Sequence, residues 1–195
     1  MNAPADTPWG LFDAWLRDAT ASEPDVPDAM QVATVDPSGR PSLRTVLLKG
    51  WAPGELVFYT NTLSRKGHEL AGDPRVAALL HWKSLQRQAI FEGVAAPVAP
   101  EEADAYWATR PRGSQLGAWA SHQSEAIGGR DELLRALAAV ERRWEGRAVP
   151  RPPHWSGYRV AVERAELWQG RADRLHERHA WTRDGDAWRY ALLQP

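Results

Sequence analysis

Five short clusters of basic and hydroxyl side chains are the residues of this sequence best suited to chemistry on a small anion. They are Arg44-Thr-Val-Leu-Leu-Lys49, Tyr59-Thr60, Ser64-Arg65-Lys66, Arg110-Pro-Arg-Gly-Ser114 and Arg174-Leu-His-Glu-Arg178. Each cluster lies where an apolar, strand-like run ends or a helix-like run begins. Backbone N–H groups and cationic side chains can converge on a phosphate at such places. We therefore interpret the clusters as parts of sites for phosphorylated small molecules.

The composition argues against several other kinds of site. The 195 residues include 24 Lys and Arg against 25 Asp and Glu, so the chain lacks the excess of cations expected of a nucleic-acid-binding surface. Cysteine is absent, which excludes disulfides, thiolate metal sites and cysteine nucleophiles. His176 and His179 do not form a His-Glu-x-x-His motif, and the neighbouring arginines would repel a dication, so we expect no metal site.

Length and hydropathy favour one soluble domain. A chain of 195 residues suits a single large core. No run approaches the roughly 18 apolar residues of a membrane-spanning helix, and residues 1–8 show no basic segment followed by an apolar one. We expect a cytoplasmic protein with no membrane partner.

Helices are expected where apolar residues recur at helical spacing. Trp9, Phe12 and Leu16 form such a face behind a Thr7 cap and Pro8. Three more helices are expected, and they cover residues 64–70, 100–107 and 130–144.

Strands are expected in the apolar runs that turn residues separate. These runs are residues 30–35, 42–49, 56–59, 76–81, 87–98, 155–162, 165–169 and 188–193. The first three are joined by short Pro/Gly turns, which predicts an antiparallel meander that the next two strands extend. Runs of strands with helices between them, without βα alternation, predict a mainly β member of the α+β class: a small antiparallel barrel that carries helices.

The clusters, taken in order from about Pro8 to the carboxyl terminus, resemble the pyridoxamine 5′-phosphate oxidase family. The resemblance also rests on Phe58-Tyr-Thr-Asn61, Gln86-Arg-Gln88, the extended run from Arg110 to Trp119, Ser121-His-Gln-Ser124 and Leu167-Trp168. It implies an antiparallel split β-barrel of Greek-key type with flanking helices. Residues 1–195 would form a single FMN-binding domain, with residues 1–7 as a flexible arm. It further implies a homodimer with flavin mononucleotide (FMN) in the subunit interface.

The resemblance assigns roles to individual positions. FMN would be held by Arg44, Val46, Leu47, Lys49, Tyr59, Thr60, Arg65, Lys66, Gln88, Gln123, Ser124, Trp168 and Arg178. The substrate would be held by Lys49, Tyr106, Arg110 and Ser114 at its phosphate and by Arg174, Leu175 and His176 at its pyridine ring. Cations and hydroxyls suit a phosphate, and glutamine amides suit the donor and acceptor edge of a flavin. Arg174 and His176 are the expected catalytic residues, through either proton transfer or orientation of the substrate.

The implied activity is that of a flavoprotein of vitamin B6 metabolism. Pyridoxine 5′-phosphate or pyridoxamine 5′-phosphate would be oxidised to pyridoxal 5′-phosphate, with O2 as acceptor and release of hydrogen peroxide. The Leu193-Gln194-Pro195 ending also resembles the related flavin oxidases of phenazine biosynthesis, which form the first alternative. A phenazine precursor would not need the phosphate site that Lys49 and Arg110 suggest. The second alternative is a non-catalytic protein that binds FMN or pyridoxal phosphate.

The sequence departs from the family pattern at three places. Only seven residues precede Pro8, so the arm that closes over the substrate in many relatives is expected to be short or missing. Leu192 stands where relatives commonly carry Arg, and His122 replaces a frequent Lys. We expect the last two positions to lie at the rim of the site, where they remove no named contact.

Overall fold

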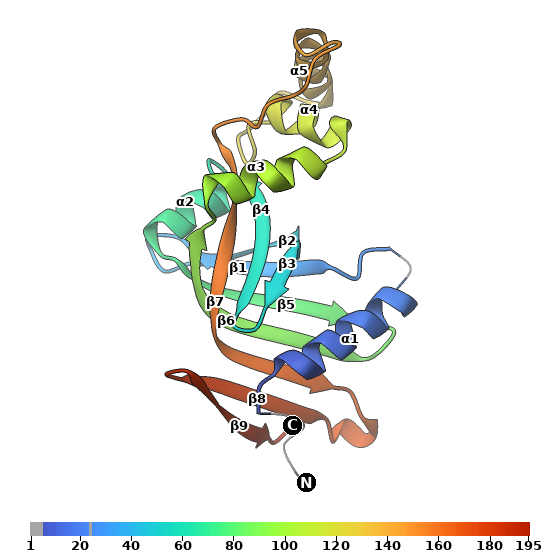
Figure 1. Cartoon of the computed structure of the whole chain (residues 1–195), viewed down its shortest axis with the longest axis vertical. Coiled ribbons are helices and arrows are strands. Elements are labelled where there is room, and N and C mark those ends of the chain that lie inside the picture. The colour runs from blue at the N-terminus through green and yellow to red at the C-terminus, as the bar shows by residue number, and fades with distance from the viewer. Residues whose placement is uncertain (1–5, 24) are drawn as a thin grey trace.

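The computed structural model describes residues 6–23 and 25–195, which form a nine-stranded sheet with helices along it (Figure 1). The strands are β1 (Ala29–Val35), β2 (Pro41–Leu47), β3 (Gly50–Ala52), β4 (Glu55–Asn61), β5 (Arg75–Trp82), β6 (Arg87–Pro97), β7 (Trp155–Gln169), β8 (Glu177–Asp184) and β9 (Ala187–Leu193). The helices are α1 (Trp9–Ser22), α2 (Arg65–Gly72), α3 (Pro100–Thr109), α4 (Arg112–Ala120), α5 (Arg130–Arg143) and the 3₁₀ turn η1 (Ala172–Arg174). The antiparallel split barrel with flanking helices is confirmed. The arm expected over residues 1–7 falls mostly outside the described residues.

The strand order corrects the expected meander. The order is β2-β1-β5-β6-β7-β4-β3, with β8 paired to β7 and β9 to β8, and every pairing is antiparallel. β1 does pair with β2, but β4 pairs with β7, from Glu55↔Ala161 to Asn61↔Trp155, and not with β2. Of the expected meander, the β1–β2 and β5–β6 pairs are confirmed, whereas β4 lies next to neither β2 nor β5 and takes its partner from far along the chain. As a result β2 and β4 are free to line a common opening.

The strands expected at 155–162 and 165–169 are a single strand, β7, of 15 residues. Its register with β6 shifts between Glu92 and Gly93, so that Glu163 has no partner. An extra residue of this kind is a β-bulge, which bends a strand without ending it. A Cβ on Gly93 would lie 2.0 Å from the Ala161 oxygen, so the close approach of the two strands at the bulge requires glycine.

Four elements were not expected from the sequence: the short β3 and η1, and α4 and β8, which carry weak local signals. α4 contains Gly113 and Gly117, which lower helix propensity, and it is held by burial of Leu116 and Ala120. β8 is rich in charge and buries Ala180 and Trp181 alone. Both lie within or beside the basic clusters.

Two expected helix caps are corrected. α1 begins at Trp9 with Pro8 in the cap position, and no side chain caps it, so the Thr7 cap was wrong. Ser64 does precede α2, but its hydroxyl donates to the Asn61 carbonyl at 2.6 Å and caps no N–H group.

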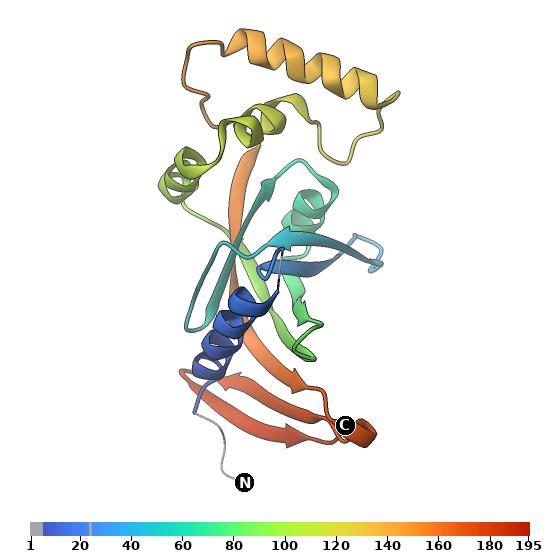
Figure 2. The ribbon, with the colours of Figure 1, turned by 90° about the vertical axis from the view of Figure 1, so that its right-hand side faces the viewer.

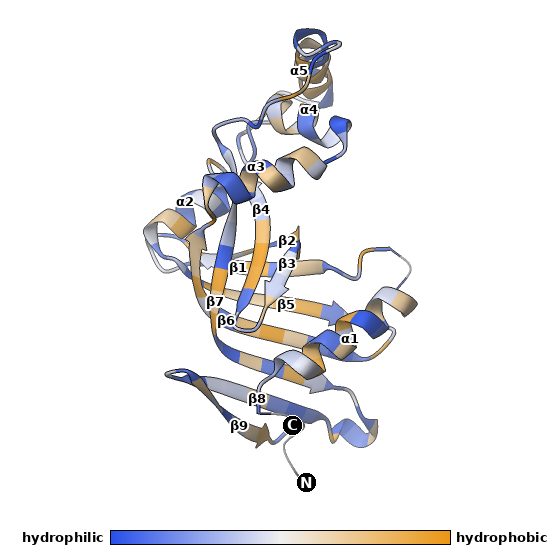
Figure 3. Ribbon diagram, in the orientation of Figure 1, coloured by the Kyte–Doolittle hydropathy of each residue, from blue (hydrophilic) through white to orange (hydrophobic). Residues whose placement is uncertain are grey.

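The main core lies between α1 and the middle of the sheet. Trp9 stacks on Phe91 with ring centroids 5.8 Å apart, and Phe12 meets the same ring edge-on. Figure 3 shows apolar residues concentrated on β4, β5 and β6, whereas β8 is largely hydrophilic. A second, smaller cluster contains Trp107 and Trp155 and joins α3 and α4 to the start of β7. None of the helices in the described part of the chain has the length and apolar character needed to cross a bilayer.

Candidate active site

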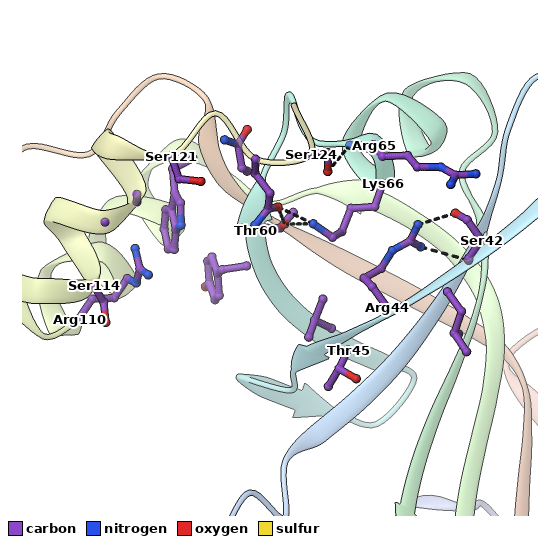
Figure 4. A pocket seen from close by; sticks show the side chains of 18 of the residues that line it. Ser42, Arg44, Thr45, Thr60, Arg65, Lys66, Arg110, Ser114, Ser121 and Ser124 are labelled. Atoms are coloured by element: carbon purple, nitrogen blue, oxygen red, sulfur yellow. Dashed lines mark hydrogen bonds between the residues drawn. The ribbon is translucent and has the colours of Figure 1, made fainter. Parts of the chain in front are cut away.

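A cavity of about 950 Å³ lies between β2, β4, α2 and α4 (Figure 4). Ten of the residues assigned to FMN or substrate line it: Arg44, Val46, Tyr59, Thr60, Arg65, Lys66, Arg110, Ser114, Gln123 and Ser124. They come from segments up to 80 positions apart, since Arg44 and Ser124 are among them. The topology therefore brings together most of the clusters that the sequence suggested.

A tight turn between β4 and α2 positions the two cations at the start of that helix. Asn61 accepts a hydrogen bond from the Leu63 N–H at 2.8 Å, which closes the turn. A Cβ on Gly67 would lie 2.0 Å from the Thr62 oxygen, so glycine lets the helix sit directly on the turn. Arg65 then donates its backbone N–H to the Ser124 hydroxyl at 3.1 Å. This bond ties the start of α2 to the segment that follows α4.

Lys66 is a buried cation held by neutral oxygens. Its Nζ donates to Gln123 Oε1 at 2.6 Å, to Thr60 Oγ1 at 2.7 Å and to Ser64 Oγ at 3.1 Å, and the residue is 7% exposed. No carboxylate among residues 6–23 and 25–195 forms an ion pair with it. Burial, with a smaller contribution from the charge of Arg44, lowers the pKa of Lys66 to about 8. A buried ammonium without a counter-ion favours binding of an anion.

Glu69, which sequence reasoning missed, organises the two arginines beside that lysine. Its side chain is 4% exposed, its Oε1 accepts from Arg65 Nε at 2.7 Å, and its Oε2 accepts from Arg44 Nη2 at 3.1 Å and from Ser42 Oγ at 2.6 Å. Burial acts to raise the pKa of Glu69, but the hydrogen bonds from Ser42, Thr34 and the two arginines outweigh it and lower that pKa to about 2. Arg65 and Glu69 are four positions apart in a helix, and this spacing is the sequence signal from which their ion pair could have been predicted.

The two arginines that share the Glu69 carboxylate differ in how many guanidinium nitrogens remain free to bind an anion. The terminal nitrogens of Arg44 are occupied by Glu69, Ser42, Thr34 and the Val32 carbonyl. Arg65 uses its Nε on Glu69, and its two terminal nitrogens form no hydrogen bond to the described residues. Arg65 therefore keeps a two-nitrogen face for an incoming anion, whereas Arg44 mainly contributes charge and rigidity.

Arg110 is a second cation that forms no ion pair with the residues that the structure describes. Its guanidinium carbon lies 4.6 Å from the Trp155 ring centroid and 5.1 Å from that of Trp107, and its Nη1 is buried without a hydrogen-bond partner. Burial lowers the pKa of Arg110. A buried N–H group without an acceptor is costly, and a phosphate oxygen would satisfy it. Ser114 lies nearby in the first turn of α4; its backbone N–H donates to the Pro111 carbonyl at 2.9 Å, so its hydroxyl is the group that it can offer to a phosphate.

An aromatic stack forms the wall next to Arg110. Tyr59 and Tyr106 are parallel within 17°, with ring centroids 4.0 Å apart, and Tyr59 also stacks on Trp155 at 5.4 Å. Tyr106 reaches the site through this stack and does not line the cavity itself. Burial and the neighbouring Glu102 raise the pKa of Tyr59 to about 12, so its phenol stays protonated. The wall is flat and apolar, which suits a planar ring.

The remaining assigned residues lie elsewhere in this chain. Gln88, Trp168 and Arg178 form one row across β6, β7 and β8, in the register Gln88↔Trp168↔Arg178. His176 packs on Trp168 with ring centroids 4.6 Å apart, and Arg178 pairs with Glu166 at 2.7 Å. β8 lies at the end of the molecule opposite α4 (Figures 1 and 2). This group therefore does not meet the cavity within one chain.

The last four assigned residues are also outside the cavity. Arg174 and Leu175 are exposed at η1 and just after it. Leu47 is exposed at the end of β2, and Lys49 forms an ion pair with Asp28 at 2.6 Å. Each of these side chains is accessible from outside the chain to some degree, but none lines the cavity.

The fold and the cavity together define a split-barrel protein whose cavity suits a phosphorylated, planar small molecule. Residues 16–144 match the family model described as pyridoxamine 5′-phosphate oxidase, and residues 155–195 match the pyridoxine 5′-phosphate oxidase C-terminal dimerisation region. The chain belongs to the pyridoxamine 5′-phosphate oxidase family. The match to a dimerisation region, which covers β7, β8 and β9, supports a homodimer.

Individual relatives agree with this assignment. Proteins named pyridoxine/pyridoxamine 5′-phosphate oxidase are 55% identical in Rubrobacter xylanophilus, over 94% of this chain and 85% of the relative, and 54% identical in Sphingopyxis alaskensis, over 98% and 88%. Among solved structures, PhzG from Burkholderia lata in complex with tetrahydrophenazine-1-carboxylic acid is 33% identical, with a TM-score of 0.92 over 98% of this chain and 94% of that one. A related FMN-binding protein from Nostoc punctiforme, 17% identical with a TM-score of 0.79, shows the shared fold alone.

Proposed function

We propose that this protein is an FMN-dependent oxidase that converts pyridoxine 5′-phosphate or pyridoxamine 5′-phosphate to pyridoxal 5′-phosphate, with O2 as acceptor and hydrogen peroxide as second product. One observation carries the proposal: the cavity holds two separate cations, the buried Lys66 and the half-buried Arg110, and neither forms an ion pair with the described residues. Figure 4 shows them on opposite sides of the cavity. Two uncompensated cations suit two phosphate groups, one on the cofactor and one on the substrate.

The residues around Lys66 fit FMN. Lys66 and the free nitrogens of Arg65 offer positive charge to its phosphate, and the Ser124 hydroxyl lies at the start of the same helix. Gln123 uses its Oε1 on Lys66, so its amide nitrogen remains to donate to an acceptor on the flavin edge. Bound there, FMN would supply the two-electron acceptor that amino-acid side chains lack.

The residues around Arg110 fit the substrate. Arg110 and Ser114 would hold its phosphate, and Tyr106 would support them from the aromatic wall. Arg174 and His176 would lie at the pyridine ring, with Leu175 beside them. In this arrangement the chain's own residues bind both partners and align the reacting carbon, and this positioning is their main catalytic contribution.

A second copy of the chain would complete the site. The row Gln88, Trp168 and Arg178 and the turn that carries His176 lie away from the cavity of their own chain, within or next to the segment that matches a dimerisation region. FMN in the subunit interface would contact the cavity of one protomer and this row of the other. The dimer would then hold two identical sites.

The deciding experiment is aerobic turnover of pyridoxine 5′-phosphate by the purified, FMN-saturated protein. We expect pyridoxal 5′-phosphate and hydrogen peroxide to form in equal amounts. A protein that binds FMN but makes neither product would refute the proposal. The second candidate, an oxidase of dihydrophenazine acids, is favoured by the structural match to PhzG, and turnover of such an acid should be measured in parallel.

Subunit complementation tests the shared site. We expect Lys66→Met and Arg178→Met homodimers each to be nearly inactive. A mixed dimer has one site with both substitutions and one with neither, so each mixed dimer should have about half of the activity of the parent dimer. Absence of any recovery in a mixture that forms heterodimers would argue that each site comes from one chain.

A further inference from the structure

The turn between β7 and β8, residues 170–177, holds the His176 ring in one orientation. His176 Nδ1 lies 3.1 Å from the backbone nitrogen of Arg171 in hydrogen-bonding geometry. One face of the ring packs on Trp168, with centroids 4.6 Å apart and planes at 47°. A hydrogen bond on one nitrogen and an aromatic contact on the face together leave the Nε2 edge available to a ligand.

Hydrogen bonds fix the turn at both ends. The Arg171 guanidinium donates to the Glu177 carboxylate from Nε and Nη2, both at 3.0 Å, and the Gly170 N–H donates to the Gln86 carbonyl at 2.7 Å. Between Arg171 and Glu177, the residues Asp173 and Arg174 have φ angles of 54° and 59°. Non-glycine residues adopt this left-handed conformation at a cost, and they retain it where surrounding contacts enforce it. The position of His176 is therefore set by the turn before any ligand binds.

The bond from Arg171 decides where the histidine carries its proton. A backbone N–H can only donate, so Nδ1 must present its lone pair, and the neutral ring must carry its hydrogen on Nε2. We propose that the 170–177 turn presets His176 as the Nε2–H tautomer, so that His176 donates a hydrogen bond to an acceptor atom on the pyridine ring of the substrate and does not serve as the proton acceptor.

This inference rests on the proposed function for the identity of the substrate. A general base needs a lone pair directed at the proton that it removes. The single lone pair of the neutral ring points at Arg171, back into its own turn. The 3-oxygen or the ring nitrogen of a pyridoxine phosphate can accept the bond from Nε2–H. Orientation of the substrate, and not removal of its proton, is then the task of His176.

The tautomer can be measured without any turnover. Long-range ¹H–¹⁵N NMR distinguishes a protonated ring nitrogen from one that carries a lone pair, and loss of a signal in His176→Gln assigns it among the six histidines of the chain. We expect Nε2 to be protonated and Nδ1 to be bare in the FMN-loaded protein. A proton on Nδ1, or an even mixture of the two forms, would overturn the proposal whether or not the protein is an oxidase.

Two substitutions of His176 test whether its Nε2–H group donates a hydrogen bond to the ligand. The amide nitrogen of Gln can reach about where Nε2–H stands, whereas the shorter Asn side chain reaches only to the position of Nδ1. We expect both variants to bind pyridoxal 5′-phosphate more weakly than the parent, with His176→Asn about tenfold weaker than His176→Gln, as for loss of one hydrogen bond. Absorbance titration measures this, and FMN fluorescence confirms that each variant is folded.

A neighbouring histidine provides the control. His179 lies in β8, contacts Tyr190 of β9 at 3.0 Å and has no role in the proposed site. His179→Gln should leave the affinity for pyridoxal 5′-phosphate unchanged. If His176→Asn binds as well as or better than His176→Gln, the Nε2 donor is not used and the proposal fails.

Discussion

Lys66 donates a hydrogen bond from Nζ to Oε1 of Gln123 at 2.6 Å, across a separation of 57 residues. This bond joins α2 to the segment that follows α4. Helix α2 carries the cations proposed to bind FMN, and α4 carries Ser114, which is proposed to bind the substrate. Because the hydrogen-bond partners of Lys66 within the described part of the chain are all neutral, its charge is free to respond to a bound phosphate. The two sides of the cavity are thus connected through this ammonium group as well as through the bond from the Arg65 N–H to Ser124.

The pH dependence of FMN binding should report on that ammonium. Lys66 has a pKa of about 8, so it is charged below this pH and loses its charge above it. A phosphate prefers the charged form, so we expect FMN affinity to fall about tenfold between about pH 7 and pH 9. Fluorescence titration measures it. Riboflavin lacks the phosphate and should show no such loss, and Lys66→Met should bind FMN weakly but with little change over this range.

Replacement of Arg110 should separate substrate binding from cofactor binding. Arg110→Met removes a half-buried cation whose Nη1 has no partner among the described residues, so the fold should not lose stability. Loss of a charged hydrogen bond to phosphate costs about 1.5–3 kcal/mol, which predicts a KM for pyridoxine 5′-phosphate raised by about 10-fold to 150-fold. The dissociation constant of FMN should stay within about twofold. Steady-state kinetics and FMN titration test both statements.

Arg112 is a matched control for Arg110. It donates to the carbonyls of Arg147 and Trp144 at 2.8 and 2.6 Å, away from the cavity. Arg112→Met should lower the free energy of unfolding by about 1 kcal/mol, as for the loss of hydrogen bonds, and should leave KM nearly unchanged. An equal rise of KM in both variants would contradict a specific phosphate contact by Arg110.

Glu69 should stabilise the fold through its ion pairs. Glu69→Ala leaves Arg44 partly buried without its carboxylate, which predicts a loss of about 3 kcal/mol in urea unfolding at neutral pH. The pKa of about 2 lies below the ordinary value, so the contribution of the ionised group is complete above about pH 4.5 and is lost as the pH falls toward 2. The stability difference between parent and variant should shrink over that range. The exposed Glu163 is the control, since Glu163→Ala should change stability by less than about 0.5 kcal/mol.

Two glycine-to-alanine substitutions should change the stability of the protein in opposite directions. At Gly67 a Cβ would overlap the Thr62 oxygen, so Gly67→Ala should destabilise the protein by about 3 kcal/mol and weaken FMN binding by shifting the start of α2. Gly10 lies inside α1 with open space around its Cβ position, so Gly10→Ala should stabilise by about 0.5–1 kcal/mol. Urea unfolding of both variants checks the contrast, and a stabilised Gly67→Ala protein would refute the packing argument.

Arg174 should matter for turnover more than for folding or cofactor binding. Its side chain is exposed in the turn, so Arg174→Leu should keep the melting temperature and the FMN dissociation constant. We expect kcat for pyridoxine 5′-phosphate to fall by at least about tenfold because the pyridine ring loses a positioning contact. An unchanged turnover number would remove Arg174 from the proposed site.

The sequence by itself determined the local elements and the family. Apolar spacing predicted the helix at 130–144, which the structure shows at Arg130–Arg143, and short turns predicted the pairing of β1 with β2. The ordered basic clusters indicated a phosphate-binding split barrel. These features could be predicted because helical and strand periodicity, turn residues and motif spacing are properties of short segments.

The tertiary structure decided which charges are compensated and which are not. Glu69 pairs with both Arg44 and Arg65, whereas Lys66 and Arg110 have no carboxylate partner among the described residues, and the sequence alone does not distinguish these four cations. The pairing of β4 with β7 and the distance of the Trp168 row from the cavity were equally hidden. Counter-ions, strand partners and burial depend on contacts between segments far apart in the chain, and local periodicity does not encode these contacts.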